Sequence, residues 1–304
     1  MTTRMIRLVL FAVVLGAVSA PLAAQQDFSN VRIRTERLTD NLYVLMGSGG
    51  NIGLSVGEDG PFVVDDQFAP LTDKIKAAIG ALSDQNVSWV MNTHWHGDHT
   101  GGNENFGDGG AFIVAHDNVY RRLNPAEFRE LVGERSAQMP AAGLPVVTFD
   151  HTMTFHWNGE DLRIFHVEHA HTDGDAVVHF QKGDVVHMGD TFFNGFYPFI
   201  DIGSGGNVNG MIHAAEVVLS FATSGTKIIP GHGPVSDVAG LRSFRDMLQT
   251  VRDNVLTMVN DGASEEEVVA SNPTAEFDEV WAARGDEWTG RFVVSVYQSL
   301  SEGR

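Results

Sequence analysis

The chain has 304 residues, of which 43% are hydrophobic and 19% are charged, a composition typical of a globular protein with a sizeable core. Its formal net charge of −19 at pH 7 argues against nucleic acid or an anionic membrane surface as a partner. It contains no cysteine, which excludes disulfides as a source of stability and thiolates as metal ligands.

The N-terminal segment has the three regions of a secretory signal peptide. Met1–Arg7 carries two arginines and no acid, Leu8–Val18 is apolar, and Ser19–Ala24 is rich in small residues. The apolar core is short for a membrane span, which needs about 20 residues. We therefore expect cleavage after Ala24, no stable span afterwards, and a periplasmic or secreted protein with a net charge of −21, because two arginines are lost from −19.

Residues 25–304 are expected to form one domain in which strands and helices follow one another. Apolar runs bounded by glycine, asparagine and aspartate predict strands, and apolar residues at helical spacing predict helices. The expected strands are Val31–Leu38, Leu42–Met46, Asn51–Val56, Pro61–Asp65, Val87–Met91, Phe112–Ala115, Val146–Phe149, Thr152–Trp157, Leu162–Val167, Ala176–Phe180, Asp184–Met188 and Lys227–Ile229. The main expected helices are Leu71–Leu82, Asp117–Leu123, Val208–Ala222, Ser236–Asn260, Glu265–Ser271 and Gly290–Leu300.

Two halves rich in strands, each finished by helices, predict an α/β fold. The expected architecture is a four-layer αββα sandwich, with two mixed sheets flanked by helices.

The densest group of possible metal ligands directly follows a predicted buried strand. In an extended chain, His94 and His96 point the same way and can converge on one ion. Gly97 favours a turn that would redirect Asp98, and His99 is better placed for a second ion. Imidazole and carboxylate donors without thiolate suit zinc and its first-row neighbours.

Further ligands are expected at other strand ends, where loops converge on one edge of the fold. A catalytic zinc ion takes about three protein ligands and a water molecule, so two ions need about six protein groups. Three segments qualify: Glu168–Asp175, Gly189–Thr191 and Pro230–Gly233. His169 and His171 have the same strand phase, so spacing alone does not choose between them.

The ordered motifs resemble those of the metallo-β-lactamase-fold hydrolase superfamily. The resemblance spans about residues 30–235 and rests on His94-x-His96-x-Asp98-His99, His171-Thr172, Asp190 in Gly-Asp, and His232 in Gly-His-Gly. It implies an αββα sandwich with two zinc ions at one sheet edge, and it favours His171 over His169.

The resemblance also implies a role for each ligand. It assigns His94, His96 and His171 to one ion, assigns Asp98, His99 and His232 to the other, and makes Asp190 a bridge between the two ions. Asp65 falls where the family often has an aspartate that steadies the histidine loop.

Such a site predicts metal-assisted hydrolysis of a small carbonyl compound. Zinc lowers the pKa of bound water to about 7 and so supplies hydroxide at neutral pH. Asp98 is the expected catalytic residue, holding the attacking water and passing its proton to the leaving group. Phe193, Asn194 and Tyr197 are candidates for a substrate pocket, the alternative being that the aromatic residues pack in the core.

The sequence leaves the substrate, the oligomeric state and the choice among zinc, iron and manganese open. β-Lactamases of this superfamily usually carry cysteine or serine where this chain has Asp190, and the segment after Asp190 has no lysine or arginine to anchor a lactam carboxylate. Asp190 is what glyoxalase-type and lactonase-type members show, so the resemblance implies a general exported hydrolase of a β-lactam, lactone, ester or amide, with β-lactam cleavage as a weak activity. The alternatives are a phosphodiesterase, a diiron redox scaffold and a non-catalytic metal-binding protein.

Overall fold

The computed structural model describes residues 27–124 and 139–301. Residues 31–304 group into one compact unit, separate from residues 1–30. The predicted signal peptide, residues 1–24, lies outside the described residues. Among the helices of the described part, none combines the length and the hydropathy needed to cross a membrane.

The first sheet contains seven strands among the described residues, in the order in which they occur in the chain. The first three pairings are antiparallel and the last three are parallel. Glycine and aspartate in turns such as Gly57–Gly60 accept the backbone angles that closely spaced antiparallel strands require. The strands are β1 (Arg34–Arg37), β2 (Leu42–Met46), β3 (Ile52–Ser55), β4 (Phe62–Val64), β5 (Trp89–Met91), β6 (Phe112–His116) and β7 (Val147–Phe149).

The second sheet has the order β13-β12-β11-β10-β9-β8 within the described chain. Its strands are β8 (Thr152–Trp157), β9 (Glu160–His166), β10 (Ala176–Phe180), β11 (Val185–His187), β12 (Lys227–Ile229) and β13 (Ser236–Asp237). Only the β11–β12 pair is parallel, so this sheet is mixed as well.

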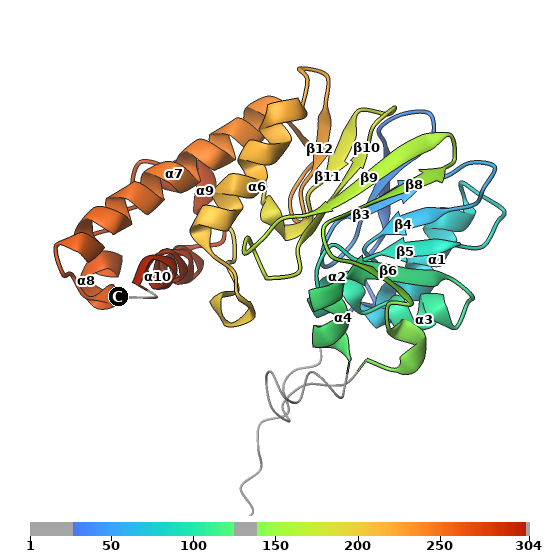
Figure 1. Ribbon diagram of the computed structural model, residues 1–304, viewed down its shortest axis with the longest axis horizontal. Helices are drawn as coiled ribbons and strands as arrows, with labels where there is room; N and C mark the ends of the chain where they lie inside the picture. The colour runs from blue at the N-terminus through green and yellow to red at the C-terminus, as the bar shows by residue number, and fades with distance from the viewer. Residues whose placement is uncertain (1–26, 125–138, 302–304) are drawn as a thin grey trace, which may run out of the picture. The chain divides into compact units, whose positions relative to one another are not determined.

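Helices cover the outer faces of both sheets. Figure 1 shows α6 and α7 on one side of the sheets and α1 and α3 on the other. The α-helices are α1 (Thr72–Gly80), α2 (Gly97–Thr100), α3 (Asn103–Gly107), α4 (Asp117–Leu123), α6 (Val208–Phe221), α7 (Val238–Asn260), α8 (Glu265–Ala270), α9 (Asp278–Trp281) and α10 (Asp286–Ser301). The short 3-10 helices are η1 (Ala69–Leu71), η2 (Ala141–Gly143), η3 (Gly189–Thr191) and η4 (Ile202–Ser204).

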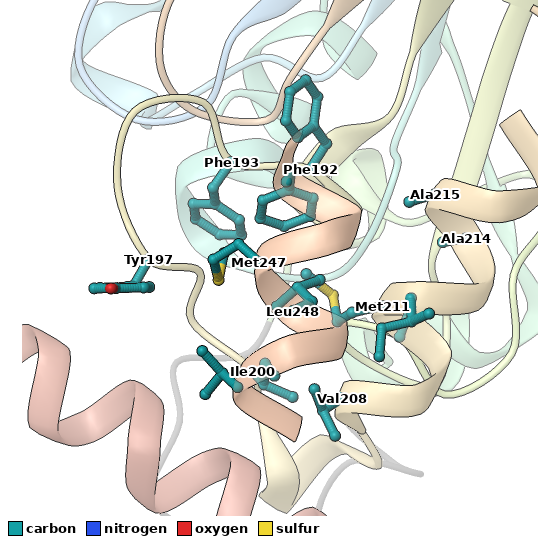
Figure 2. Close-up of a cluster of buried hydrophobic side chains, with 14 of the residues drawn as sticks. Phe192, Phe193, Tyr197, Ile200, Val208, Met211, Ala214, Ala215, Met247 and Leu248 are labelled. Atoms are coloured by element: carbon teal, nitrogen blue, oxygen red, sulfur yellow. The ribbon is translucent and has the colours of Figure 1, made fainter. Parts of the chain in front are cut away.

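Two apolar cores hold these layers together. Between the sheets, Val44 and Phe62 of the first sheet share a buried cluster with Leu162 and Val178 of the second. The outer face of the second sheet and the helices α6, α7 and α10 form the other cluster. Figure 2 shows part of it, with the side chains that follow β11 packed near α7. Burial of apolar surface in both places fixes the sheets relative to the helices.

The directions of the strands bring the loops that carry the ligand motifs to one edge. β4 and β5 run parallel, so the segments after them leave the first sheet at the same end. β9 and β11 both run antiparallel to β10, and β12 runs parallel to β11, so the segments after these three strands also leave together. Backbone bonds join the two edges: Ala176 N donates to Thr93 O over 2.8 Å, and Asn51 N donates to Gly231 O over 2.7 Å.

The predicted four-layer αββα sandwich is confirmed, and most of its elements lie where the apolar patterns place them. Two short elements, β13 and α9, were not expected, because two to four residues show no periodicity. α2 was not expected either. It begins at Gly97, directly after the extended His96, and its turn redirects Asp98 and His99 away from the direction of the preceding strand.

Candidate metal centre

Four side chains that could bind one ion meet at the shared edge of the sheets. Donor atoms of His94, His96, His171 and Asp190 all lie within 4.8 Å of one another. His94 and His171 are fully buried, and Asp190 is 5% exposed. These residues come from the segments after β5, β9 and β11, which are far apart in the chain.

A second group of possible ligands lies beside the first. Donor atoms of Asp98, His99 and His232 also lie within 4.8 Å of one another. The Oδ1 atom of Asp190 is 3.1 Å from His99 Nε2, and its Oδ2 atom is 3.4 Å from His232 Nε2. Asp190 therefore contacts both groups, as a bridging ligand would.

Glycines let the backbone approach these ligands closely. A Cβ atom at Gly50 would lie 2.1 Å from Cε1 of His99, and one at Gly231 would lie 2.0 Å from Oδ1 of Asp190. No other residue fits at either position without displacing a candidate ligand.

Asp65 lies directly behind the histidine loop, where the resemblance placed it. Its buried carboxylate accepts hydrogen bonds from Thr93 N (2.7 Å) and Thr93 Oγ1 (2.8 Å), and from Nδ1 of His99 (2.7 Å). Because the Thr93 hydroxyl gives its proton to Asp65, it accepts from Nδ1 of His94 at 3.1 Å. Asp65 itself has φ of +64°, a costly backbone angle for a residue other than glycine that orients its carboxylate toward this loop.

Two further acceptors orient the remaining histidines of the first group. Nδ1 of His171 donates to the backbone oxygen of Phe199 over 2.8 Å, and Nε2 of His96 donates to Oδ2 of Asp201 over 2.9 Å. Their other ring nitrogens, His171 Nε2 and His96 Nδ1, face each other at 2.9 Å. The protein thus fixes the tautomer in which a lone pair of each ring points into the cluster.

The donors fit a metal ion better than they fit one another. Nε2 of His94 is buried and makes no hydrogen bond to any described residue. The Nε2 atoms of His99 and His232 face each other at 3.4 Å, although both rings carry raised pKa values. A divalent cation between such atoms would replace proton–proton repulsion by coordination, and nitrogen and carboxylate oxygen are donors that zinc accepts.

The charges within the metal-free cluster shift the pKa values of the candidate ligands. Burial disfavours the charged form of His232, but Asp190 and Asp98 outweigh it and raise the pKa of His232 to about 9. Burial opposes ionisation of Asp98 as well, yet the neighbouring His99 and His232 lower the pKa of Asp98 to about 2. In the first group, burial lowers the pKa of His171 to about 4. At pH 7 Asp98 is therefore ionised and His171 neutral, as metal binding requires, whereas His232 is protonated and would release its proton to an incoming ion.

Asp201 contacts this site although no sequence motif predicts it. It lies in no motif, and only the fold brings its carboxylate to His96. Burial raises the pKa of Asp201, but the hydrogen bonds from His96 and Ser204 lower it to about 2, so it faces His96 as a carboxylate.

Replacing Asp201 with alanine is expected to lower both the zinc affinity and kcat/KM by about 10- to 100-fold, because His96 loses the partner that fixes its tautomer. Competition against a chromogenic chelator measures the affinity. Asp237→Ala is the matched control, since Asp237 caps α7 through Gly240 N without contacting a candidate ligand. Equal zinc affinity in the Asp201→Ala variant and the wild-type protein would contradict this role.

The other histidines lie outside the cluster. His169, the alternative to His171, is exposed, and its Nδ1 lies 3.0 Å from the oxygen of Gly205. His187 is buried with Nε2 3.0 Å from the oxygen of Asn51. Both rings therefore face backbone oxygens, and neither belongs to the two donor groups.

Of the three residues expected to line a substrate pocket, Phe193 lies closest to the cluster. Its ring stacks on His232 at 5.4 Å and 19° and lies 6.1 Å from the ring of His171. Asn194 follows it and is half-buried, and one N–H of its amide donates to the oxygen of Pro234 over 2.9 Å.

The expectation for Tyr197 is wrong. The side chain is fully buried, and its hydroxyl donates to Oδ1 of Asp278 at 2.8 Å and lies 3.2 Å from the oxygen of Thr274. Its ring stacks on Phe292 of α10 at 4.9 Å. Figure 2 shows Tyr197 pointing away from Phe193. The chain turns between these two residues. Phe193 therefore faces the candidate ligands, and Tyr197 faces the core beside α10.

Sequence comparison gives a family for most of the chain. The sequence model of the metallo-beta-lactamase superfamily matches residues 47–232, which include all seven candidate ligands. No curated protein is similar enough in sequence to match.

Solved structures of low sequence identity share the fold. The DIM-1 metallo-beta-lactamase is 19% identical with a TM-score of 0.60, over 72% of this chain and 99% of that one. A metallo-beta-lactamase from Pontibacter korlensis is 18% identical with a TM-score of 0.58, over 72% and 99%. The sec-alkylsulfatase Pisa1 from Pseudomonas sp. is 15% identical with a TM-score of 0.69, over 90% of this chain and 51% of that one.

Proposed function

The chain belongs to the metallo-beta-lactamase superfamily, and from this premise we propose that it is a hydrolase with two zinc ions. It would cleave a C–N or C–O bond beside the carbonyl group of a small molecule. The observation that carries this proposal is the pair of donor groups joined by Asp190. One metal-binding group alone would not need a carboxylate placed between two sets of histidines.

The seven candidate ligands would bind two ions. His94, His96 and His171 would hold one ion, Asp98, His99 and His232 the other, and Asp190 would contact both. When bound, zinc ions acidify water and polarise a carbonyl oxygen. Two divalent cations exceed the charge of two carboxylates, so the loaded site would attract an electron-rich oxygen.

Asp98 is the best-placed residue to move the proton. Its side chain is 26% exposed, whereas those of Asp190 and Asp65 are 5% and 0% exposed. Asp98 is therefore the most exposed carboxylate of the site, ahead of Asp201 at 19%, whose carboxylate accepts the hydrogen bond from His96. It would orient the attacking water and then deliver a proton to the leaving nitrogen or oxygen.

A sulfate ester is the second candidate substrate. The likeness to the sec-alkylsulfatase covers 90% of this chain and so extends beyond the region that the family sequence model matches. Both candidates are small molecules with an oxygen that a cationic site would attract. We also propose export, based on the N-terminal pattern, which N-terminal sequencing of the protein purified from the periplasm or medium would test.

The proposed activity is tested with the zinc-loaded protein and a substrate panel. The panel contains nitrocefin, an aromatic lactone, a 4-nitrophenyl ester, a secondary alkyl sulfate, a thioester and bis(4-nitrophenyl) phosphate. We expect hydrolysis of the lactone or the ester, with weaker cleavage of nitrocefin. Cleavage of the phosphodiester alone, or of no substrate while zinc is bound, would contradict the proposal. Bound iron together with no hydrolysis of any substrate in the panel would favour a redox role instead.

A further inference from the structure

One basic side chain outside the ligand motifs lies over the aromatic residues beside the metal centre. The guanidinium carbon of Arg284, between α9 and α10, is 3.7 Å from the ring centroid of Phe196 and 4.5 Å from that of Trp288. Arg284 is exposed, and no carboxylate of the described residues lies within ion-pair distance of it. Stacking holds a guanidinium in place while its in-plane N–H groups stay free to bind an anion.

Aromatic rings connect Arg284 to the candidate ligands along two routes. Phe196 contacts Phe193 at 5.6 Å, and Phe193 stacks on His232. Trp288 contacts Phe199 at 6.5 Å, and Phe199 contacts the rings of His171 at 5.8 Å and His96 at 6.1 Å. We call the set Phe193, Phe196, Phe199 and Trp288 the aromatic wall.

Contacts within the protein hold the aromatic wall in place. Nε1 of Trp288 donates to the oxygen of Tyr197 over 2.7 Å, which fixes the indole that supports Arg284. Phe199 is 40% exposed although it touches two candidate ligands, so its ring faces solvent at the metal centre. Phe199 and Trp288 also line a cavity of about 280 Å³ with Pro198, Arg291 and Phe292. This cavity offers room for an apolar group.

Arg284 also lies within the electrostatic field of the cluster. The rings of Phe196 and Trp288 partly desolvate the exposed guanidinium and lower the pKa of Arg284, and the carboxylates of Asp190 and Asp98 oppose that shift. A guanidinium stays protonated under all ordinary conditions. Its positive charge therefore persists close enough to the candidate ligands to interact with Asp190 and Asp98.

We propose that Arg284 anchors an anionic group of the substrate while the carbonyl group lies at the metal centre and the apolar part packs on the aromatic wall. The inference rests on the proposed function and narrows its substrate class to an ester, lactone or β-lactam that carries a carboxylate. The segment after Asp190 contains no lysine or arginine. The anchor comes instead from a segment almost a hundred residues further along the chain.

The test compares matched substrates in variants of one position. Mono-4-nitrophenyl esters of four- to six-carbon dicarboxylic acids are compared with the same esters capped by a methyl group. Arg284→Met, which keeps the apolar stem, is expected to raise KM for the best anionic ester by about 10- to 100-fold, the range expected for a charge-assisted hydrogen bond, and to change KM for the capped ester less than about twofold. Arg284→Lys keeps the charge but loses the planar guanidinium. Its KM for the anionic ester is expected to lie between those of the wild-type protein and Arg284→Met. Arg242→Met removes an exposed arginine of α7 as the matched control.

A binding measurement separates this inference from the proposed function. Calorimetric titration of the zinc-loaded protein with 4-phenylbutyrate and with its amide requires no turnover. We expect Arg284→Met to weaken binding of the carboxylate at least about tenfold and to leave the amide unchanged. Suppose that no ester is hydrolysed but Arg284→Met still weakens binding of the carboxylate and not of the amide. The proposed function would then be wrong, and the role of Arg284 as an anion anchor would be supported. Equal effects on charged and uncharged compounds, or no effect on either, would overturn the anchor.

Discussion

Replacing Asp98 with asparagine is expected to lower kcat/KM by about 10³- to 10⁴-fold while the fold persists, since proton transfer by a positioned group contributes up to about 10⁴-fold. Oδ2 of Asp98 lies 3.3 Å from His232 Nε2 and 3.7 Å from His99 Nε2, among groups that keep it ionised. Asparagine has nearly the same shape but cannot accept a proton, and it is a poor metal ligand. Steady-state kinetics and circular dichroism of the purified variant measure both parts of the prediction.

A second carboxylate provides the control for this variant. Asp108 is an exposed residue just after α3, and Asp108→Asn makes the same chemical change away from the cluster. It should leave kcat/KM within about twofold of the wild-type value, as expected for a surface position. An Asp98→Asn variant that keeps more than about a tenth of wild-type activity would mean that Asp98 neither binds a required ion nor moves the proton.

Removing the metal is expected to abolish hydrolysis and to lower the melting temperature without unfolding the protein. A ligand present at 100 times its dissociation constant stabilises a fold by about 2.7 kcal/mol. The fold persists without metal because Asp190 and Asp98 then pair with the protonated His232, which offsets part of the repulsion between the two carboxylates. Dialysis against a chelator, followed by activity and thermal melts, measures the effect, and added zinc should restore both.

Two outcomes would contradict this prediction. Full activity after dialysis, with less than about a tenth of the metal remaining, would exclude a metal-dependent reaction. Restoration by manganese or iron but not by zinc would leave hydrolysis in place and correct the identity of the ion. Adding the chelator together with excess zinc controls for direct effects of the chelator on the protein.

Much of the fold was predictable because its signals are local. Most strands that carry a ligand motif are short apolar runs, such as Trp89–Met91, and each motif begins within about five residues of the end of its strand. Loops after parallel strands emerge at one edge, so the order of motifs in the chain predicts a common site even though the residues are distant in sequence. The convergence of His171 and Asp190 is therefore a consequence of topology that the sequence reveals.

Other features could not be predicted, because they depend on where side chains point after packing. Asp201 follows an ordinary apolar stretch, and nothing nearby indicates that its carboxylate meets His96. Arg284 lies in a polar segment beyond the ligand motifs and reaches the site only because α9 and α10 bring it there. Tyr197 shows the opposite error, since a residue four positions after Phe193 turns into the core instead of the pocket.

The most direct test of the account is the number of zinc ions bound per chain, measured by mass spectrometry of the purified protein, of His171→Ala and of His232→Ala. We predict about two ions for the wild-type protein and about one for each variant, because each substitution removes a ligand from a different donor group. We also predict that neither variant hydrolyses the ester that the wild-type protein cleaves. Two ions bound in both variants, or fewer than one in the wild-type protein at saturating zinc, would contradict the account.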